Sequence, residues 1–285
     1  MIVWGTTWYA ITAQLAVVTP VWGVTVRFAL AAAVILLMCR WQGLPLRFPG
    51  RVQALFALQG LTAFALSYVG VYEAERHVVS GVVAVGYAAS PLVGLVLARL
   101  FLGTAMSARV ALGGLIGLAG VAVIFGREFT RLGAPSEVAL GAAITAASVL
   151  LSSLSTIVAA RYQRDGIRGW PPLAWAMAWG AAGAFGLTLG TGSPWHWAWT
   201  PAFLGSLAYL TLAGSVATFG AFYALVHRVG PARAGYVGVM SPVVALAVSS
   251  ALEGFTWTAA TVAGVALALV GQTVAMGLPR RAPAA

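Results

Sequence analysis

Ionisable side chains that could bind a charged solute or carry a proton are scarce in this sequence. The 285 residues include six acidic residues, and none of the six falls in the middle of a long apolar run. Arg27 lies inside such a run, while His77 and His227 stand at the ends of two others. A guanidinium can hold a carboxylate through two parallel hydrogen bonds, and a histidine with an ordinary pKa of about 6.5 can exchange a proton. The chemistry these residues could perform is solute recognition and proton exchange.

Each of these residues also has a structural interpretation. Arg27 could cap carbonyl groups and bridge helices, or extend towards the membrane surface, and we favour the structural role. His77 and His227 could simply stand at the membrane interface. Glu73 and Glu75 lie beyond the end of one apolar run, and Glu253 closes another. Without a carboxylate inside a run, little remains that could carry a coupling proton.

Aromatic residues recur four positions apart, so that each pair shares one face of a helix. Such faces could stack on the side chain of a small solute, while indole and phenol groups donate hydrogen bonds to its polar end. Instead of lining a cavity, the aromatic residues could form a belt at the membrane interface. The hydroxyl group of Ser148 could instead form a hydrogen bond between helices. The candidate cavity residues are Trp4, Trp8, Gln59, Tyr68, Tyr72, His77, Tyr87, Ser148, Trp175, Trp179, Tyr209 and Tyr223.

Long apolar segments must position these residues. Hydrophobic residues make up 61% of the chain and charged residues 8%, with a mean hydropathy of +0.93, which excludes an ordinary water-soluble protein. A helix needs about 20 apolar residues to cross roughly 30 Å of hydrocarbon. Runs without period-2 alternation favour helices over a closed barrel. We predict an all-α membrane protein with ten transmembrane helices at 2–19, 21–40, 52–72, 78–100, 107–126, 138–161, 171–190, 201–225, 232–252 and 258–278.

The basic residues, all arginine, indicate the orientation of these helices. Twelve of the sixteen fall in the segments on one side of the membrane. The opposite side receives Arg76, Arg127 and Arg131, and Arg27 lies within a predicted helix. By the positive-inside rule both termini are cytoplasmic. The net charge of +10 is therefore an orientation signal, and no soluble basic domain supports nucleic-acid binding.

An internal repeat relates the two halves of the chain at an offset of 151 residues. Five helices per half is an odd number, so the second half enters the membrane in the opposite direction to the first. Residues 1–133 and 134–285 then form two inverted five-helix repeats, an architecture that places a substrate site near the bilayer midplane. The matched positions are Tyr72 with Tyr223, Ser90-Pro91 with Ser241-Pro242, Gly113 with Gly264, and Gly120 with Gly271.

Two Ser-Pro pairs occupy equivalent places in the repeat. Proline removes a backbone hydrogen bond and allows a helix to bend. We expect Ser90-Pro91 and Ser241-Pro242 to be gating hinges, with Arg27 as a further structural or gating residue.

The chain resembles the drug/metabolite transporter superfamily in its ten-helix EamA-type form, and most of all bacterial exporters of aromatic and other amino acids. The resemblance implies a basket-like bundle whose cavity is lined by the first, third, fourth, sixth, eighth and ninth helices. It departs from the family around Thr104, where a glutamate is often found, and at Ala178, where the second half lacks a counterpart of Arg27. The motifs are Trp4-Gly5, Pro20, Arg27-Phe28, Ser90-Pro91, Gly113, Gly120, Ser241-Pro242, Gly264 and Gly271.

These observations favour a secondary transporter of the bacterial inner membrane. It would export small metabolites, most of all amino acids, by alternating access. We expect facilitation and not proton coupling, because no carboxylate lies within the predicted helices. The alternative is a proton-coupled drug/metabolite antiporter. An integral-membrane enzyme is disfavoured, because three scattered histidines and no paired carboxylates make no catalytic set.

The expected partners are a small-molecule substrate and the lipid bilayer. No phosphate-binding loop points to ATP, and a lone Cys39 excludes a metal site built on thiolates. We expect no cofactor and no metal. A monomer is expected, with a dimer left open.

Overall fold

Helices form the secondary structure of this protein in a computed structural model. The structure describes residues 1–103, 107–131, 135–196, 199–229 and 236–276, and that part of the chain contains no β-strand. Three helical segments change type along their length without a break. The elements are α1 (Ile2–Leu15), α2 (Pro20–Trp41), α3 (Gly50–Gly60), η1 (Leu61–Ser67), α4 (Tyr68–Ala74), α5 (Ser80–Gly86), η2 (Tyr87–Ala89), α6 (Ser90–Leu102), α7 (Ala108–Arg131), α8 (Pro135–Arg164), α9 (Trp170–Thr191), α10 (Pro201–Ala208), η3 (Tyr209–Ala217), α11 (Thr218–Val229), α13 (Tyr236–Leu252) and α14 (Ala259–Met276).

Seven helices in the described part of the chain are long and apolar enough to cross a membrane. The expected first span, 2–19, is shorter than predicted, because α1 ends at Leu15 and Thr19 is extended ahead of Pro20. A residue before proline is pushed out of the helical region. The total of ten transmembrane helices and the inverted repeat stay predictions. The seven are Pro20–Trp41, Gly50–Ala74, Ser80–Leu102, Ala108–Gly126, Ser136–Arg164, Trp170–Thr191 and Pro201–Phe222.

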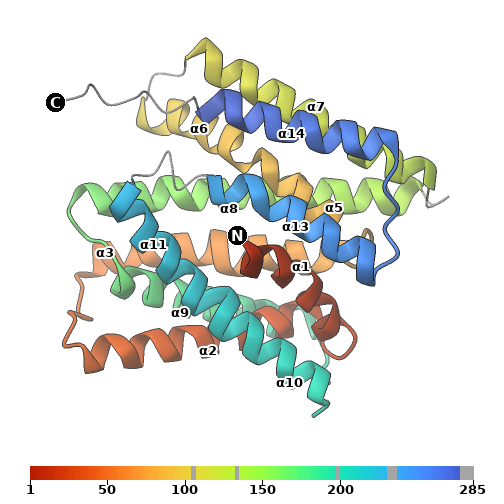
Figure 1. The fold of residues 1–285 in the computed structure, drawn as a ribbon. Helices are drawn as coiled ribbons and strands as arrows, with labels where there is room; N and C mark the ends of the chain where they lie inside the picture. Colours follow the sequence, from red (N-terminus) through yellow and green to blue (C-terminus); the bar gives the residue numbers. More distant parts are fainter. Residues whose placement is uncertain (104–106, 132–134, 197–198, 230–235, 277–285) are drawn as a thin grey trace.

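The helices lie lengthwise beside one another in a bundle (Figure 1). The pair α7 and α14 packs together along one side, and α2 packs against α9 on the other. The helices α1, α3, α8 and α13 run between these two pairs. Residues drawn from both halves of the sequence therefore meet in the middle of the bundle.

Glycines allow the close contact between α7 and α14. A side chain at Gly271 would collide with the backbone nitrogen of Gly117, and one at Gly120 would collide with the carbonyl oxygen of Gly264. Gly113 likewise faces Gly271. Small residues let helix backbones approach within a bilayer, and this order of contacts makes the two helices antiparallel.

Apolar side chains occupy both the inside and the outside of the bundle. Phe28 and Met177 are fully buried between α2 and α9, whereas Leu115 and Leu189 are 63% and 67% exposed. An outer surface rich in leucine suits lipid, since the hydrocarbon is as apolar as the side chains. The exterior thus agrees with a multi-pass membrane protein.

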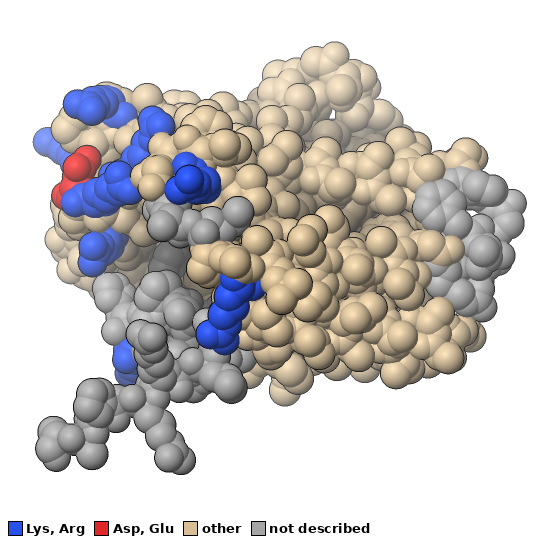
Figure 2. Space-filling view, turned by 90° about the horizontal axis from the view of Figure 1, so that it is seen from above, with Lys and Arg blue, Asp and Glu red and all other residues tan. Residues whose placement is uncertain are grey.

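Arginines gather at one end of the molecule (Figure 2). Those at 40, 47, 51, 99 and 161 are exposed, in contrast to the buried Arg27. The orientation expected from the sequence stays a prediction, because several of the arginines on which it depends lie outside the described residues. The side chains of Tyr223, Arg127, Arg131 and His227, and the residues Thr104, Arg233, Arg280 and Arg281, lie outside the part that the structure describes.

Irregular turns interrupt three of the long helices. η1 and η3 are π-helical, and η2 is a short 3₁₀ turn directly before Ser90 and Pro91. Pro242, by contrast, lies inside a continuous α13. Such irregular turns inside α-helices often mark functional sites, and here they hold Ser67, Tyr87 and Tyr209.

Candidate functional site

A chain of aromatic contacts crosses the middle of the bundle. The ring of Trp4 lies 5.5 Å from that of Phe219, and Phe219 lies 5.8 Å from Phe64. Phe64 stacks on Tyr68, which meets Phe28 edge to face at 4.7 Å. These distances are in the range where aromatic pairs attract one another. We call these five residues the central aromatic cluster; they come from α1, α11, η1, α4 and α2.

A second aromatic contact leads into a hydrogen-bonded chain. The rings of Trp8 and Tyr87 lie 5.2 Å apart. The Tyr87 hydroxyl and the Ser67 hydroxyl are 2.8 Å apart, and Ser67 donates to the carbonyl oxygen of Ser148 at 2.9 Å. The Ser148 hydroxyl itself bonds to Ile144 of its own helix. Helices α1 and α8 and the turns η1 and η2 are joined here through the predicted residues Trp8, Tyr87 and Ser148 and through Ser67, which was not predicted.

Helix α1 also bonds to the π-helical turn η3. The Tyr209 hydroxyl lies 2.5 Å from the Thr6 hydroxyl, and the indole of Trp4 donates to the carbonyl oxygen of Gly214 at 3.3 Å. A π-helical turn replaces the regular i to i−4 pattern of backbone bonds, so a carbonyl such as that of Gly214 can receive a side chain. Trp4, Trp8, Tyr68, Tyr87 and Tyr209 thus lie in the centre of the bundle.

Three other predicted cavity residues lie elsewhere. Gln59 accepts a hydrogen bond from Tyr162 at 2.8 Å in a separate buried contact between α3 and α8. Trp175 donates to the Leu46 carbonyl, and Trp179 is 41% exposed and donates to Gln53. The four-residue spacing places both tryptophans on one face of α9, and the structure does not bring them to the central aromatic cluster.

His77 lies in an ion-pair network near the surface. Its ring nitrogens are 2.5 Å from Glu137 and 3.5 Å from Glu73, and Glu73 also pairs with the exposed Arg76 at 3.1 Å. Glu73 and Arg76 line a pocket of about 430 Å³ that the α1–α2 turn and His196 border. His77 therefore joins the α4–α5 turn to the start of α8, apart from the aromatic residues.

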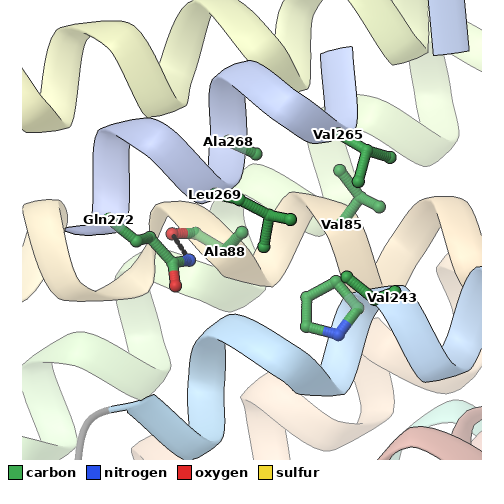
Figure 3. A pocket seen from close by; sticks show the side chains of 8 residues that line it. Val85, Ala88, Val243, Val265, Ala268, Leu269 and Gln272 are labelled. Carbon is green, nitrogen blue, oxygen red and sulfur yellow. Dashed lines mark hydrogen bonds between the residues drawn. The ribbon is translucent and has the colours of Figure 1, made fainter. Parts of the chain in front are cut away.

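The two Ser-Pro pairs differ in their local structure. At Ser90-Pro91 the helix passes through η2, and the carbonyl oxygen of Ala88 accepts a bond from Gln272 at 2.8 Å (Figure 3). Pro242 lines the same small space of about 10 Å³. Gln272 is not among the predicted residues, and its amide ties α14 to the turn before Pro91. Pro242 and the turn before Ser90 thus border one contact between the fourth, ninth and tenth predicted spans.

Arg27 is buried beside the central aromatic cluster. It is 1% exposed, its guanidinium carbon lies 5.0 Å from the centroid of the Tyr68 ring and 5.1 Å from that of Phe28, and its Nε donates to Ser215 at 3.2 Å. Cation–π contacts of this kind strengthen when water is excluded. One guanidinium nitrogen, Nη1, has no hydrogen-bond partner.

The far end of the same helices holds a cluster that the sequence did not predict. Glu253, directly after α13, accepts hydrogen bonds from the Ser80 backbone nitrogen at 3.2 Å, from the Ser80 hydroxyl at 2.6 Å and from the Ser249 hydroxyl. Ser249 in turn accepts from the Gly81 nitrogen at 2.9 Å. These bonds join the start of α5 to the end of α13. We call Ser80, Ser249 and Glu253 the α5–α13 contact.

Glu75 faces this contact from the end of α4. Both of its carboxyl oxygens are buried and have no hydrogen-bond partner. Burial raises the pKa of Glu75 well above its ordinary value and Glu253 raises it further, while Arg27 lowers it. Tyr72, buried between these groups, donates to Gln14 at 2.7 Å.

One sequence signal could have revealed Glu75. It lies three and seven residues after Tyr72 and Tyr68, on the same helical face as these two candidates. Its position after the last apolar residue instead suggested a connecting segment. The burial depends on α13, whose end meets the α4–α5 turn from far along the sequence.

Comparisons with known proteins give a family match over part of the chain and a solved structure with a similar fold. Residues 1–126 match the model of the EamA-like transporter family. A solved structure described as "Crystal structure of protein" is similar in fold, with a TM-score of 0.69 at 20% identity, and the match covers 96% of this chain and 93% of that one. No curated protein matches.

Proposed function

Since residues 1–126 of this chain match the EamA-like transporter family, we propose that it is a secondary transporter that exports small metabolites by alternating access. Amino acids, aromatic ones included, are the proposed substrates. The observation that carries the proposal is the set of aromatic and hydroxyl groups in the middle of the bundle, to which both halves of the chain contribute.

The central site suits a small amphipathic solute. Trp8 and Tyr87 offer ring faces, while Tyr209 and Thr6 offer hydroxyl groups that now bond to each other. Rings of this kind stack on an aromatic or aliphatic side chain. The paired hydroxyls can exchange their mutual bond for bonds to an amino or carboxylate group at little net cost. Arg27 lies over the rings of Phe28 and Tyr68 in the central aromatic cluster and supplies positive charge.

The proposed architecture is two inverted five-helix repeats in a membrane with ten spans. Three features support it. The π-helical turns η1 and η3 overlap after a shift of 151 residues. The glycine contacts of α7 with α14 exchange under that shift, because Gly113 faces Gly271 and Gly120 faces Gly264. The family match also ends at residue 126, close to the predicted end of the first repeat.

Helix packing offers a further argument for the repeat. α1 packs against α13, and α8 packs against α6, which are the contacts that the shift interchanges. α2 with α9 and α7 with α14 are pairs that the shift maps onto themselves. A two-fold relation of this kind lets the halves exchange conformations and so expose a central site to either side.

The proposed location is the bacterial inner membrane with both termini in the cytoplasm. The exposed arginines at one end of the bundle support this orientation through the positive-inside rule (Figure 2). The α5–α13 contact and Glu75 then lie near the non-cytoplasmic side, with the pocket bordered by Glu73 and Arg76.

Transport into proteoliposomes tests the proposal. The purified chain would be reconstituted, and uptake of radiolabelled phenylalanine, leucine and glutamate would be compared with uptake into protein-free vesicles at equal pH inside and out. We expect phenylalanine and leucine to equilibrate faster than in the protein-free vesicles, and excess unlabelled phenylalanine to slow both. If none of the three amino acids enters faster than it enters protein-free vesicles, amino acids are excluded as the substrate class.

A further inference from the structure

The charges around Glu75 balance only when one carboxyl group carries a proton. Arg27 contributes one positive charge, whereas Glu75 and Glu253 together would contribute two negative charges. Glu253 accepts three hydrogen bonds within the α5–α13 contact, as suits a carboxylate. Glu75 accepts none, and an ionised carboxylate buried without a partner is very costly. The geometry therefore assigns the proton to Glu75.

We propose that Glu75 is a proton-binding site of the transport cycle, which holds a proton while the α5–α13 contact is closed and releases it to water when that contact opens. The inference rests on the proposed function, because it assumes that these helices separate during alternating access. It adds a ligand, the proton, that facilitation does not require.

The sign of the effect follows from the surroundings of Glu75. In the closed arrangement, burial and then Glu253 raise the pKa of Glu75, and Arg27 offsets part of this rise. Opening would hydrate the carboxyl group and return its pKa towards the ordinary value of about 4.3. At pH values between the pKa of Glu75 in the open arrangement and its pKa in the closed arrangement, each unit of rising pH shifts the ratio of open to closed protein about tenfold towards the open arrangement. Low pH on this side of the membrane favours the closed arrangement.

The groups that face Glu75 come from three elements. Glu253 follows α13, Arg27 lies in α2, and Tyr72 lies one turn back in α4 itself. The neighbouring Glu73, Arg76 and His77 belong to the surface ion pairs, in which Glu137 of α8 also takes part. A test must therefore separate Glu75 from the surface carboxylates.

The protonation state can be measured without any substrate. Infrared spectra distinguish the carbonyl stretch of a protonated carboxyl group from the bands of a carboxylate. In the full-length protein we expect a protonated-carboxyl band that persists above the pH at which ordinary glutamates have ionised. It should be absent in Glu75→Gln and present in the matched control Glu137→Gln. A band that survives in Glu75→Gln, or that is missing from the unaltered protein, overturns the assignment.

The link to opening needs a distance across the contact. Spin labels at Arg76→Cys and Thr256→Cys, in a Cys39→Ala background, report the separation of the α4–α5 turn from the α13–α14 turn. We expect the long-distance population to rise by up to about tenfold per pH unit in the labelled parent, and to stay constant with pH after Glu75→Gln. Glutamine mimics the neutral acid in shape, so a folded variant should favour the closed arrangement.

The outcomes separate this inference from the proposed function. If Glu75→Gln retains the pH dependence of the parent, or if the parent shows none, the inference fails even where phenylalanine is transported. If phenylalanine, leucine and glutamate all fail to move but the distance depends on pH through Glu75, the proton site holds and the substrate class fails. A Glu75→Gln protein that does not elute as a single species in detergent is replaced by Glu75→Asn, which is neutral and smaller.

Discussion

Tyr68 of the central aromatic cluster lies at the start of α4 and Glu75 directly after its end, but the two regions around them are stabilised in different ways. Tyr68 packs in the cluster with its ring against Phe28 and Phe64. Two turns later Glu75 is equally enclosed, yet no donor reaches its carboxyl oxygens. The first region is held by ring contacts and by a permanently charged guanidinium over two of the rings, so it has no group that gains or loses a proton near neutral pH. The second depends on how many protons it binds.

Arg27 acts on both regions. Its guanidinium lies over the Tyr68 ring and also lowers the pKa of Glu75. A single side chain therefore links the aromatic centre to the charged end. Burial alone does not make a region sensitive to pH. The region at the end of α4 is sensitive because the carboxyl group of Glu75 is buried without a hydrogen-bond partner.

Removal of Arg27 should have the largest effect. Arg27→Met removes the cation that lies over the Tyr68 and Phe28 rings and its hydrogen bond to Ser215, and we expect a loss of about 3–5 kcal/mol in the free energy of unfolding. Thermal unfolding in detergent measures the change. Arg76→Met is the control, because Arg76 is exposed and its pair with Glu73 should contribute no more than about 1 kcal/mol. Equal losses in the two variants would show that burial adds nothing to the contribution of Arg27.

Loss of the Glu253 charge should have the next largest effect. In Glu253→Gln the amide oxygen can still accept the Ser80 backbone bond, but the amide nitrogen cannot accept from the Ser80 and Ser249 hydroxyl groups, so the closed arrangement should lose about 1.5–3 kcal/mol. The like charge beside Glu75 also disappears, so the pKa of Glu75 should fall and its infrared band should vanish at a lower pH than in the parent. An unchanged titration of that band would show that Glu253 does not act on Glu75.

Two tryptophans that the sequence ranks alike should differ in their effect on transport. Trp8→Ala removes the ring that meets Tyr87, and we expect kcat/KM for phenylalanine to fall by about tenfold, which corresponds to about 1.4 kcal/mol. Trp179→Ala alters an exposed contact with Gln53 and should leave kcat/KM within about twofold of the parent. Similar losses in the two variants would remove the distinction between centre and periphery.

The helical character and the short connections could be predicted from apolar runs and prolines, whereas the role of Trp8 and Tyr87 in a solute site stays a prediction. Spacing alone could not say which face of a helix points inwards. Trp175 and Trp179 repeat with the same interval as Trp4 and Trp8, yet they bond to Leu46 and Gln53. The difference lies in how α9 is rotated against its neighbours, which local periodicity does not contain.

Glu75 shows the same limit for charge. Its distance from the end of the apolar run indicated a solvated turn, and the expectation of facilitation followed from that. In the structure α13 ends beside this turn, and the Ser80 and Ser249 bonds to Glu253 hold the two together. The hydrogen bond between Ser80 and Glu253, which are 173 positions apart, therefore decides whether the Glu75 carboxyl group meets water.

The smallest effect should come from a hydroxyl in the aromatic region. Tyr87→Phe removes the bond to Ser67 but keeps the ring contact with Trp8, so we expect a loss of about 1 kcal/mol in the free energy of unfolding. Ser67 would still donate to the Ser148 carbonyl, which limits the cost. Because the lost bond involves no change in charge, the difference from the parent should be the same between about pH 5 and pH 8. Thermal unfolding at both limits measures it. For Glu75→Gln the difference from the parent should change across that range, and a pH-dependent loss in Tyr87→Phe would show that the two regions titrate together.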